Sequence, residues 1–159
     1  MTRTQQKTFE RFTDIGHISD DPFISVDLLR MLCGEKIGEG EYRAVYNLEL
    51  KKDWVLKISI KPFSNQMEYN IWQTVKGEKI SKWFAPCYFI SPCGHFLIQK
   101  KVRRVTEKDK LPKVLPAFFA DTKKTNFGFI GSQLVCHDYH LCNAIDVSFA
   151  AQKEAKWKE

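Results

Sequence analysis

Between residues 35 and 99 the chain alternates short extended segments with tight turns, and one helical stretch interrupts them. Apolar and β-branched residues fill the extended segments, whereas glycine, proline or charged residues mark the turns. The predicted strands lie on either side of a glycine turn at 38–40, with the second continuing to residue 50, and then at 54–60, 88–90 and 95–99. The last two of these segments look like a hairpin, and the mixture of strands with one helix is typical of an α+β fold.

Three stretches have the apolar spacing or the end signals of helices. They are residues 1–33, which Gly34 would end, residues 65–75, and the terminal stretch 143–159. The middle helix places four apolar side chains on one stripe: Met67, Ile71, Trp72 and Val75. The polar stretch 100–113 is predicted to be a connector or a short helix, and 133–137 a short strand.

The length and composition fit a single compact unit. The 159 residues are 43% hydrophobic and 28% charged, which excludes both a disordered tail and a membrane-spanning chain. No run approaches the roughly 18 apolar residues of a membrane helix, and the polar N-terminus lacks the apolar core of a secretory signal. The five cysteines are odd in number and lack the CxxC spacing of zinc sites. We therefore expect a cytoplasmic protein without membrane contact, whose cysteines are reduced and mostly in the core.

Positive charge gathers toward the C-terminus. The net charge is +6, and residues 100–159 carry 12 basic and 7 acidic side chains. The excess forms two clusters: Lys100, Lys101, Arg103 and Arg104, and then Lys153, Lys156 and Lys158. Such clusters can bind nucleic acid, an acidic partner or phosphates, or they can form a solvated face. Because no zinc-finger, RRM-like or helix-turn-helix signature accompanies them, we do not expect nucleic acid to be the partner.

Five residues of the strand-and-helix region occur in an order that suits phosphate binding. Gly38 and Gly40 let the backbone approach phosphates because neither carries a Cβ. Lys57 lies within a predicted strand, where a buried ammonium needs an anion, and Glu68 on the following helix can supply one. With Val45, this order resembles the N-lobe of protein kinases, which carries GxGxxGxV, a strand lysine and a helix glutamate. The resemblance implies that these residues bind ATP and that Lys57 and Glu68 pair to steady its α- and β-phosphates.

A second group of residues follows in the C-terminal half. Residues 121–126, Asp-Thr-Lys-Lys-Thr-Asn, fit the pattern D-x-K-x-x-N, and Asp138 follows a predicted strand further along the chain. Oxygen ligands brought together by a short hairpin make a sensible magnesium site. The segment resembles the catalytic loop of serine/threonine kinases, with Asp138 in the place of the DFG aspartate. The resemblance implies that Asp121 accepts the proton of the substrate hydroxyl, that Lys123 steadies the γ-phosphate, and that Asn126 and Asp138 hold Mg²⁺.

The two groups together span residues 35–140 and resemble a minimal kinase, similar to the short kinase-like proteins that bacteriophages encode. The implied fold is α+β and protein-kinase-like: a five-stranded antiparallel N-lobe sheet with an αC-type helix, and a truncated, mainly helical C-lobe. The implied domains are an N-terminal helical extension at 1–34, the N-lobe at 35–102 and the truncated C-lobe at 103–159. A phage-encoded chain would act in the host cytoplasm.

The sequence departs from the family pattern at several positions. Arg43 stands where the glycine loop has its third glycine, and it could lie over bound phosphates or be solvated on a shortened loop. His140 replaces the glycine of DFG, and with His137 it could join the metal site or lie outside it. The His-Arg pair that precedes the catalytic aspartate is missing, and only 21 residues follow Asp138, without an APE motif.

These features leave two functions open. The ATP-binding and catalytic-type residues favour an ATP-dependent phosphotransferase that transfers the γ-phosphate to a hydroxyl of a protein or a small molecule. The missing substrate platform and the altered glycine loop favour a catalytically inactive kinase-like module that binds and modulates a partner protein, such as a host protein. The basic C-terminal half is then the expected interface. A truncated lobe also exposes apolar surface, which a homodimer would cover.

Overall fold

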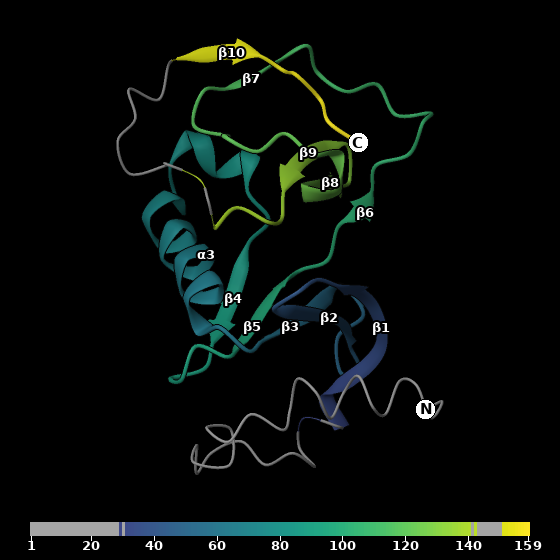
Figure 1. Ribbon diagram of the computed structural model, residues 1–159, viewed down its shortest axis with the longest axis vertical. Helices are drawn as coiled ribbons and strands as arrows, with labels where there is room; N and C mark the ends of the chain where they lie inside the picture. The colour runs from purple at the N-terminus through teal and green to yellow at the C-terminus, as the bar shows by residue number, and fades with distance from the viewer. Residues whose placement is uncertain (1–28, 30, 141, 143–150) are drawn as a thin grey trace. The chain divides into compact units, whose positions relative to one another are not determined.

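The computed structural model describes residues 29, 31–140, 142 and 151–159 (Figure 1). The chain forms two units, which we describe separately. The first unit takes in Met1–Gln66 and Cys87–Lys101, and the second takes in Met67–Pro86 and Val102–Glu159. The predicted helix at 1–33 falls almost entirely outside the described residues. The second unit resumes beside the predicted boundary at 102, but it also includes residues 67–86, which the sequence assigned to the first lobe.

A five-stranded antiparallel sheet forms the first unit, which confirms that part of the prediction. In spatial order its strands are β1 (Cys33–Glu39), β2 (Arg43–Leu48), β3 (Trp54–Ser59), β5 (Phe96–Lys100) and β4 (Cys87–Ile90). β1 includes Gly34, which the sequence analysis placed at the end of a helix. Cys33 pairs with Leu48, so the neighbouring strand extends β1 into residues that carry no strand signal of their own.

The two faces of this sheet differ because successive side chains of a strand point to opposite sides. One face packs into an apolar core, whose buried strand residues include Ala44, Tyr46, Leu56, Ile58 and Phe96. Each large apolar side chain buried in this way contributes about 1.5–3 kcal/mol to folding. The opposite face carries Val45 and Lys57, and Lys57 is buried although it is charged.

The helix α3 (Pro62–Val75) begins three residues before its predicted start. Proline suits the first helical position because an N–H there would have no partner within the helix. The buried Asn65 amide donates to the carbonyl oxygens of His95 (2.9 Å) and Gly94 (3.1 Å), in the turn between β4 and β5. Gly94 has a φ of +75°, and a Cβ there would lie 2.8 Å from the Cβ of Pro62. The glycine therefore lets the start of the helix pack closely on this turn.

The second unit contains short strands and 3-10 turns besides the later part of α3. β6 (Arg103–Arg104), β8 (Phe127–Ile130) and β9 (Gln133–Cys136) form one sheet in the order β6-β8-β9. β7 (Val114–Pro116) pairs with β10 (Gln152–Glu154), and η1 (Lys79–Trp83) and η2 (Lys124–Asn126) are 3-10 turns. None of the described residues after Val102 lies in an α-helix. The predicted mainly helical C-lobe is therefore wrong for this part of the chain.

The predicted terminal helix at 143–159 is also wrong for residues 151–159, whereas 143–150 lie outside the described residues. In its place, β10 pairs antiparallel with β7, and Lys153 lies opposite Leu115. Alanine, lysine and glutamate favour a helix locally, but this preference is weak. Pairing with an apolar strand outweighs it here.

Aromatic rings fill the core of the second unit. Phe84 contacts Tyr139 edge-on and stacks on Phe118, with ring centroids 5.0 and 5.4 Å apart. Phe119 and Phe127 are 5.2 Å apart, and all five rings are buried. Each such pair stabilises the fold by about 0.5–1.5 kcal/mol beyond the contribution of burial alone. Phe118 and Phe119 therefore belong to the core of this unit.

All five cysteines are free thiols and four are buried, which confirms that most are core residues. Burial raises the pKa of the Cys33 thiol to about 12, so the thiol is protonated and unreactive at neutral pH. Within the described part of the chain, no helix has the length and the apolar character needed to cross a membrane.

Replacing Asn65 with alanine should destabilise the first unit, because the Gly94 carbonyl loses its side-chain donor and the His95 carbonyl keeps only the Ser59 N–H. We expect the free energy of unfolding to fall by about 1–3 kcal/mol, the usual cost of leaving such groups unpaired. Urea denaturation followed by circular dichroism measures the change. Asn70→Ala, at an exposed position of the same helix, is the matched control and should alter stability by less than ~0.5 kcal/mol. Equal stability of the two variants would contradict the role given to Asn65.

Candidate functional site

Three of the residues predicted to bind nucleotide lie in one row across the sheet of the first unit. Gly38 of β1 is opposite Val45 of β2, and Val45 is opposite Lys57 of β3. Side chains of directly opposite residues lie on the same face of a sheet. Val45 and the buried Lys57 therefore share one face, with the backbone of Gly38 beside them.

Gly40 lies in the turn between β1 and β2, with Gly38 near the end of β1 and Arg43 at the start of β2. The Gly40 N–H donates to the carbonyl oxygen of Arg43 (2.8 Å), which closes a tight turn. A Cβ added at either glycine would meet no atom nearer than 3.7 Å, and neither glycine has a positive φ. The fold itself therefore does not require glycine at these two positions. Arg43 is half-buried and lies two residues before Val45 in β2, so it belongs to the same face of the sheet as Val45 and Lys57.

In the second unit, the predicted catalytic loop gathers its polar groups around the Asp121 carboxylate. The Asn126 amide donates from Nδ2 to Asp121 Oδ2 (3.0 Å), and the Lys123 N–H donates to Asp121 Oδ1 (3.2 Å). The Lys123 ammonium lies 3.9 Å from Asp121 Oδ2. The Asp121 side chain is 28% exposed, so a hydroxyl group from solution can reach it.

The β8–β9 hairpin brings Asp138 to the same end of the hairpin as Asn126. Phe127, which follows Asn126, pairs with Cys136. The His137 N–H then donates to the Asn126 carbonyl oxygen (2.9 Å), so the pairing continues one residue beyond the strands. Antiparallel pairing thus places Asn126 beside the residue that precedes Asp138.

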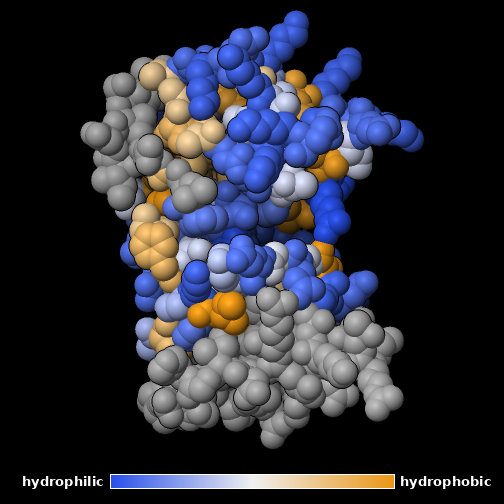
Figure 2. All heavy atoms as spheres, viewed as in Figure 1, coloured by the Kyte–Doolittle hydropathy of each residue, from blue (hydrophilic) through white to orange (hydrophobic). Residues whose placement is uncertain are grey.

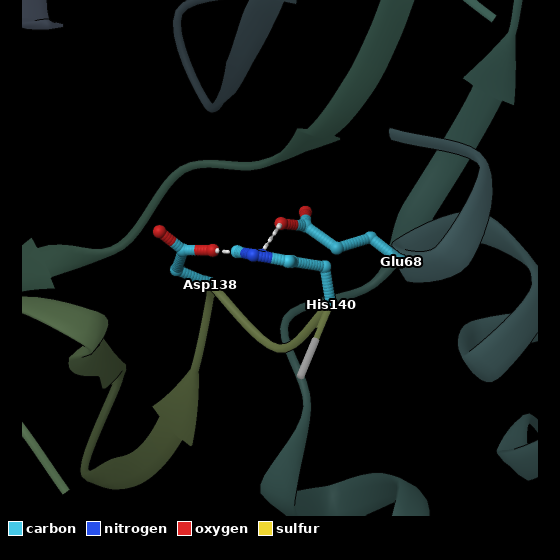
Figure 3. A group of neighbouring side chains, drawn as sticks. All are labelled: Glu68, Asp138 and His140. Carbon is cyan, nitrogen blue, oxygen red and sulfur yellow. Dashed lines mark hydrogen bonds and ion pairs between the residues drawn. The ribbon is translucent and has the colours of Figure 1, made fainter. Parts of the chain in front are cut away.

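Asp138 has two further neighbours in this unit. His140 Nδ1 lies 2.8 Å from Asp138 Oδ1 and 4.0 Å from Glu68 Oε1 (Figure 3). Glu68 comes from α3 and is buried, whereas Asp138 and His140 follow β9 and are about one-third exposed. The sequence analysis paired Glu68 only with Lys57 and left the place of His140 open. No local pattern could join them, because Glu68 and His140 are far apart in the sequence.

The sequence analysis missed the role of residues 156–158, which we call the C-terminal strap. The Lys124 N–H donates to the Lys158 carbonyl oxygen (2.9 Å), so the strap lies along the loop that carries Asp121. Trp157 donates its indole N–H to a backbone carbonyl (3.0 Å) and packs edge-on against Phe127, with ring centroids 5.1 Å apart. A tryptophan within a charged terminal segment was the one available signal of this packing.

Part of the first basic cluster is neutralised within the fold. Arg103 donates two hydrogen bonds to Asp109 (2.7 and 2.9 Å), and its guanidinium holds the pKa of that carboxyl well below its usual range. The Lys100 ammonium lies 3.5 Å from Asp53 Oδ2. Figure 2 shows hydrophilic side chains gathered over the strands of the second unit. The face is polar, but two of the four cluster residues have acidic neighbours, which weakens the prediction that the cluster is an interface.

Comparison with known proteins adds no family assignment to this geometry. No protein-family model and no curated protein matches the chain. The functional argument therefore depends on the residues and on their arrangement.

Removing the Trp157 ring should loosen the loop that carries Asp121, because the ring anchors the C-terminal strap. We expect Trp157→Ala to speed hydrogen exchange of the Lys124 amide by about five-fold or more, since roughly 1–3 kcal/mol of local stability is lost. NMR-detected amide exchange measures this. Trp157→Phe keeps a ring against Phe127 and should have a smaller effect. Equal protection of Lys124 in all three proteins would show that the strap does not depend on Trp157.

Proposed function

We propose that the chain is an ATP-dependent phosphotransferase of the minimal serine/threonine-kinase-like type, which transfers the γ-phosphate to a hydroxyl of a protein or a small molecule. One observation carries the proposal: the second unit gathers Asp121, Asn126 and Asp138 through one loop and the β8–β9 hairpin. The resemblance assigns these residues to acceptor activation and to magnesium binding.

The geometry of the first unit supports ATP as the phosphoryl donor. Packing does not require the glycines at 38 and 40, and a backbone without Cβ atoms there lets phosphates approach the N–H groups of the turn. On the neighbouring strands, Val45 offers an apolar contact and Lys57 a buried ammonium on the same face. An apolar contact beside a cation suits a nucleotide, which combines a base with charged phosphates.

We further propose the Lys57–Glu68 pair that the resemblance implies. Both side chains are almost fully buried, and a buried charge is costly unless an opposite charge and hydrogen bonds compensate it. In the proposed reaction, the Lys57 ammonium steadies the α- and β-phosphates.

The residues of the second unit have distinct proposed roles. The Asp121 carboxylate accepts the proton of the acceptor hydroxyl as that oxygen bonds to the γ-phosphorus and ADP leaves. Lys123 offsets the charge of the transferred phosphoryl group. Asn126 and Asp138 offer an amide oxygen and a carboxylate, which are ligands that Mg²⁺ accepts. When bound, Mg²⁺ supplies positive charge to the phosphates. Because Asn126 donates to Asp121 through Nδ2, its Oδ1 is the atom that would face the ion.

The alternative function, an inactive kinase-like module that modulates a partner protein, has one observation in its favour. The described residues after Val102 form short strands and a 3-10 turn in place of the helical platform on which kinases hold peptide substrates. The two functions differ in what they ask of Asp121. Phosphoryl transfer needs its carboxylate, whereas partner binding does not.

Mg-ATP should raise the melting temperature of the protein, because a ligand that binds only the folded state stabilises it. Gly40→Ala should leave the melting temperature without nucleotide unchanged, since the added Cβ meets no atom nearer than 3.8 Å. The same change should reduce the shift that Mg-ATP produces, and Lys57→Ala should abolish most of it. Differential scanning fluorimetry measures these shifts. A transition that millimolar Mg-ATP leaves unmoved would contradict nucleotide binding.

Two isosteric changes should separate the enzyme from the binding module. Asp121→Asn should leave Mg-ATP affinity nearly intact and slow transfer by ~10²–10⁴, because a general base acts on the transition state. Asp138→Asn should weaken Mg-dependent ATP binding and also abolish transfer. Transfer of label from γ-labelled ATP and calorimetry of ATP binding measure the two effects, with the exposed Asp53→Asn as the matched control. Full biological activity of the Asp121→Asn protein would reject the phosphotransferase and keep the binding module.

A further inference from the structure

Glu68, Asp138 and His140 form a cluster of metal-ligating side chains within the second unit. One ligand atom of each lies within 4.8 Å of the other two, and the imidazole contacts both carboxylates (Figure 3). We propose that these three residues bind a divalent transition-metal ion of the zinc type. This proposal goes beyond the proposed phosphotransferase, because the site needs neither ATP nor an acceptor.

The spacing of the ligand atoms suits such an ion. Zinc binds imidazole nitrogen and carboxylate oxygen at about 2.0–2.2 Å, so the ligand atoms of a tetrahedral site lie roughly 3.4 Å apart. His140 Nδ1 lies 2.8 Å from Asp138 Oδ1 and 4.0 Å from Glu68 Oε1, on either side of that value. A bound ion would lengthen the first distance and shorten the second.

The donor atoms favour a transition metal over magnesium or calcium. Magnesium and calcium take oxygen ligands, whereas imidazole nitrogen suits zinc, cobalt and nickel. Two carboxylates and one imidazole supply three protein ligands and leave a position for water, as in zinc sites that act on small molecules.

The backbone holds two of the ligands in place through the residue between them. Tyr139 is buried, and its hydroxyl donates to the Ala85 carbonyl oxygen (2.9 Å). The Cys142 N–H donates to the Tyr139 carbonyl oxygen (2.9 Å), which closes a turn around His140. An anchored backbone and the buried Glu68 mean that little freedom is lost when an ion binds. The partly exposed His140 gives the ion access to the site.

Glu68 and Asp138 each contribute a carboxylate to the cluster. A divalent cation bound between the carboxylates would offset their mutual repulsion.

Titration of the nucleotide-free, chelator-treated full chain with Zn²⁺ tests the site by calorimetry. We expect one equivalent to bind, and His140→Ala to weaken binding by at least ten-fold, because even changes next to metal ligands cost about 10- to 100-fold. Asp138→Asn should weaken binding as well. His137→Ala is the matched control, since His137 is a half-buried histidine outside the cluster, and it should bind zinc like the unchanged protein.

Cobalt then identifies the ligands. The Co²⁺-loaded protein should show visible absorption bands that His140→Ala loses, without a near-ultraviolet band from a thiolate ligand. Thermal melts without metal show that each variant is folded. Absence of zinc binding, equal affinity of His140→Ala and His137→Ala, or a thiolate band that Cys142→Ser removes would overturn the assignment. Zinc binding in a protein that never transfers phosphate would support this site and reject only the phosphotransferase.

Discussion

The pairing of β8 with β9 is the constraint on which the polar site of the second unit depends. Phe127 opposite Cys136 sets the register, and the bond from the His137 N–H to the Asn126 carbonyl continues it. A slip of one residue would turn each side chain of a strand to the other face. Such a slip would expose Phe127, whose ring is packed against Phe119 and Trp157. Burial of an aromatic ring therefore fixes where the polar groups at the strand ends meet.

Local patterns were enough to predict the strands of the first unit, and three of its four strand pairings join neighbours across short connections. The fourth, between β3 and β5, spans α3 and β4. The glycine turn between β1 and β2 and the turn between β4 and β5 are both visible as breaks between apolar runs. The pairing of β7 with β10 could not be predicted in this way. It joins residues 114–116 to 152–154, and the second of these segments has helix-favouring residues. A short stretch of sequence does not show which distant strand it will pair with, because that depends on the fold of the whole chain.

The residues of the candidate site likewise differ in whether local sequence patterns could bring them together. The row of Gly38, Val45 and Lys57 follows from adjacent strands, so their spacing in the sequence already placed them together. The meeting of Glu68 with His140 links a helix to the end of a hairpin much later in the chain, and the sequence could only leave the role of that histidine open. The strap was missed for the same reason, since its partner, the loop around Lys124, lies far from it in the sequence.

His140 stands where the kinase pattern has glycine, and its ring changes what the neighbouring aspartate can do. The imidazole lies 2.8 Å from Asp138 Oδ1, so an ion that binds this oxygen must either displace the ring or bind it as well. Magnesium prefers oxygen ligands and would have to displace the ring from that oxygen. A zinc-type ion can keep both groups as ligands. This one contact therefore disfavours magnesium at Asp138 and favours a zinc-type ion there.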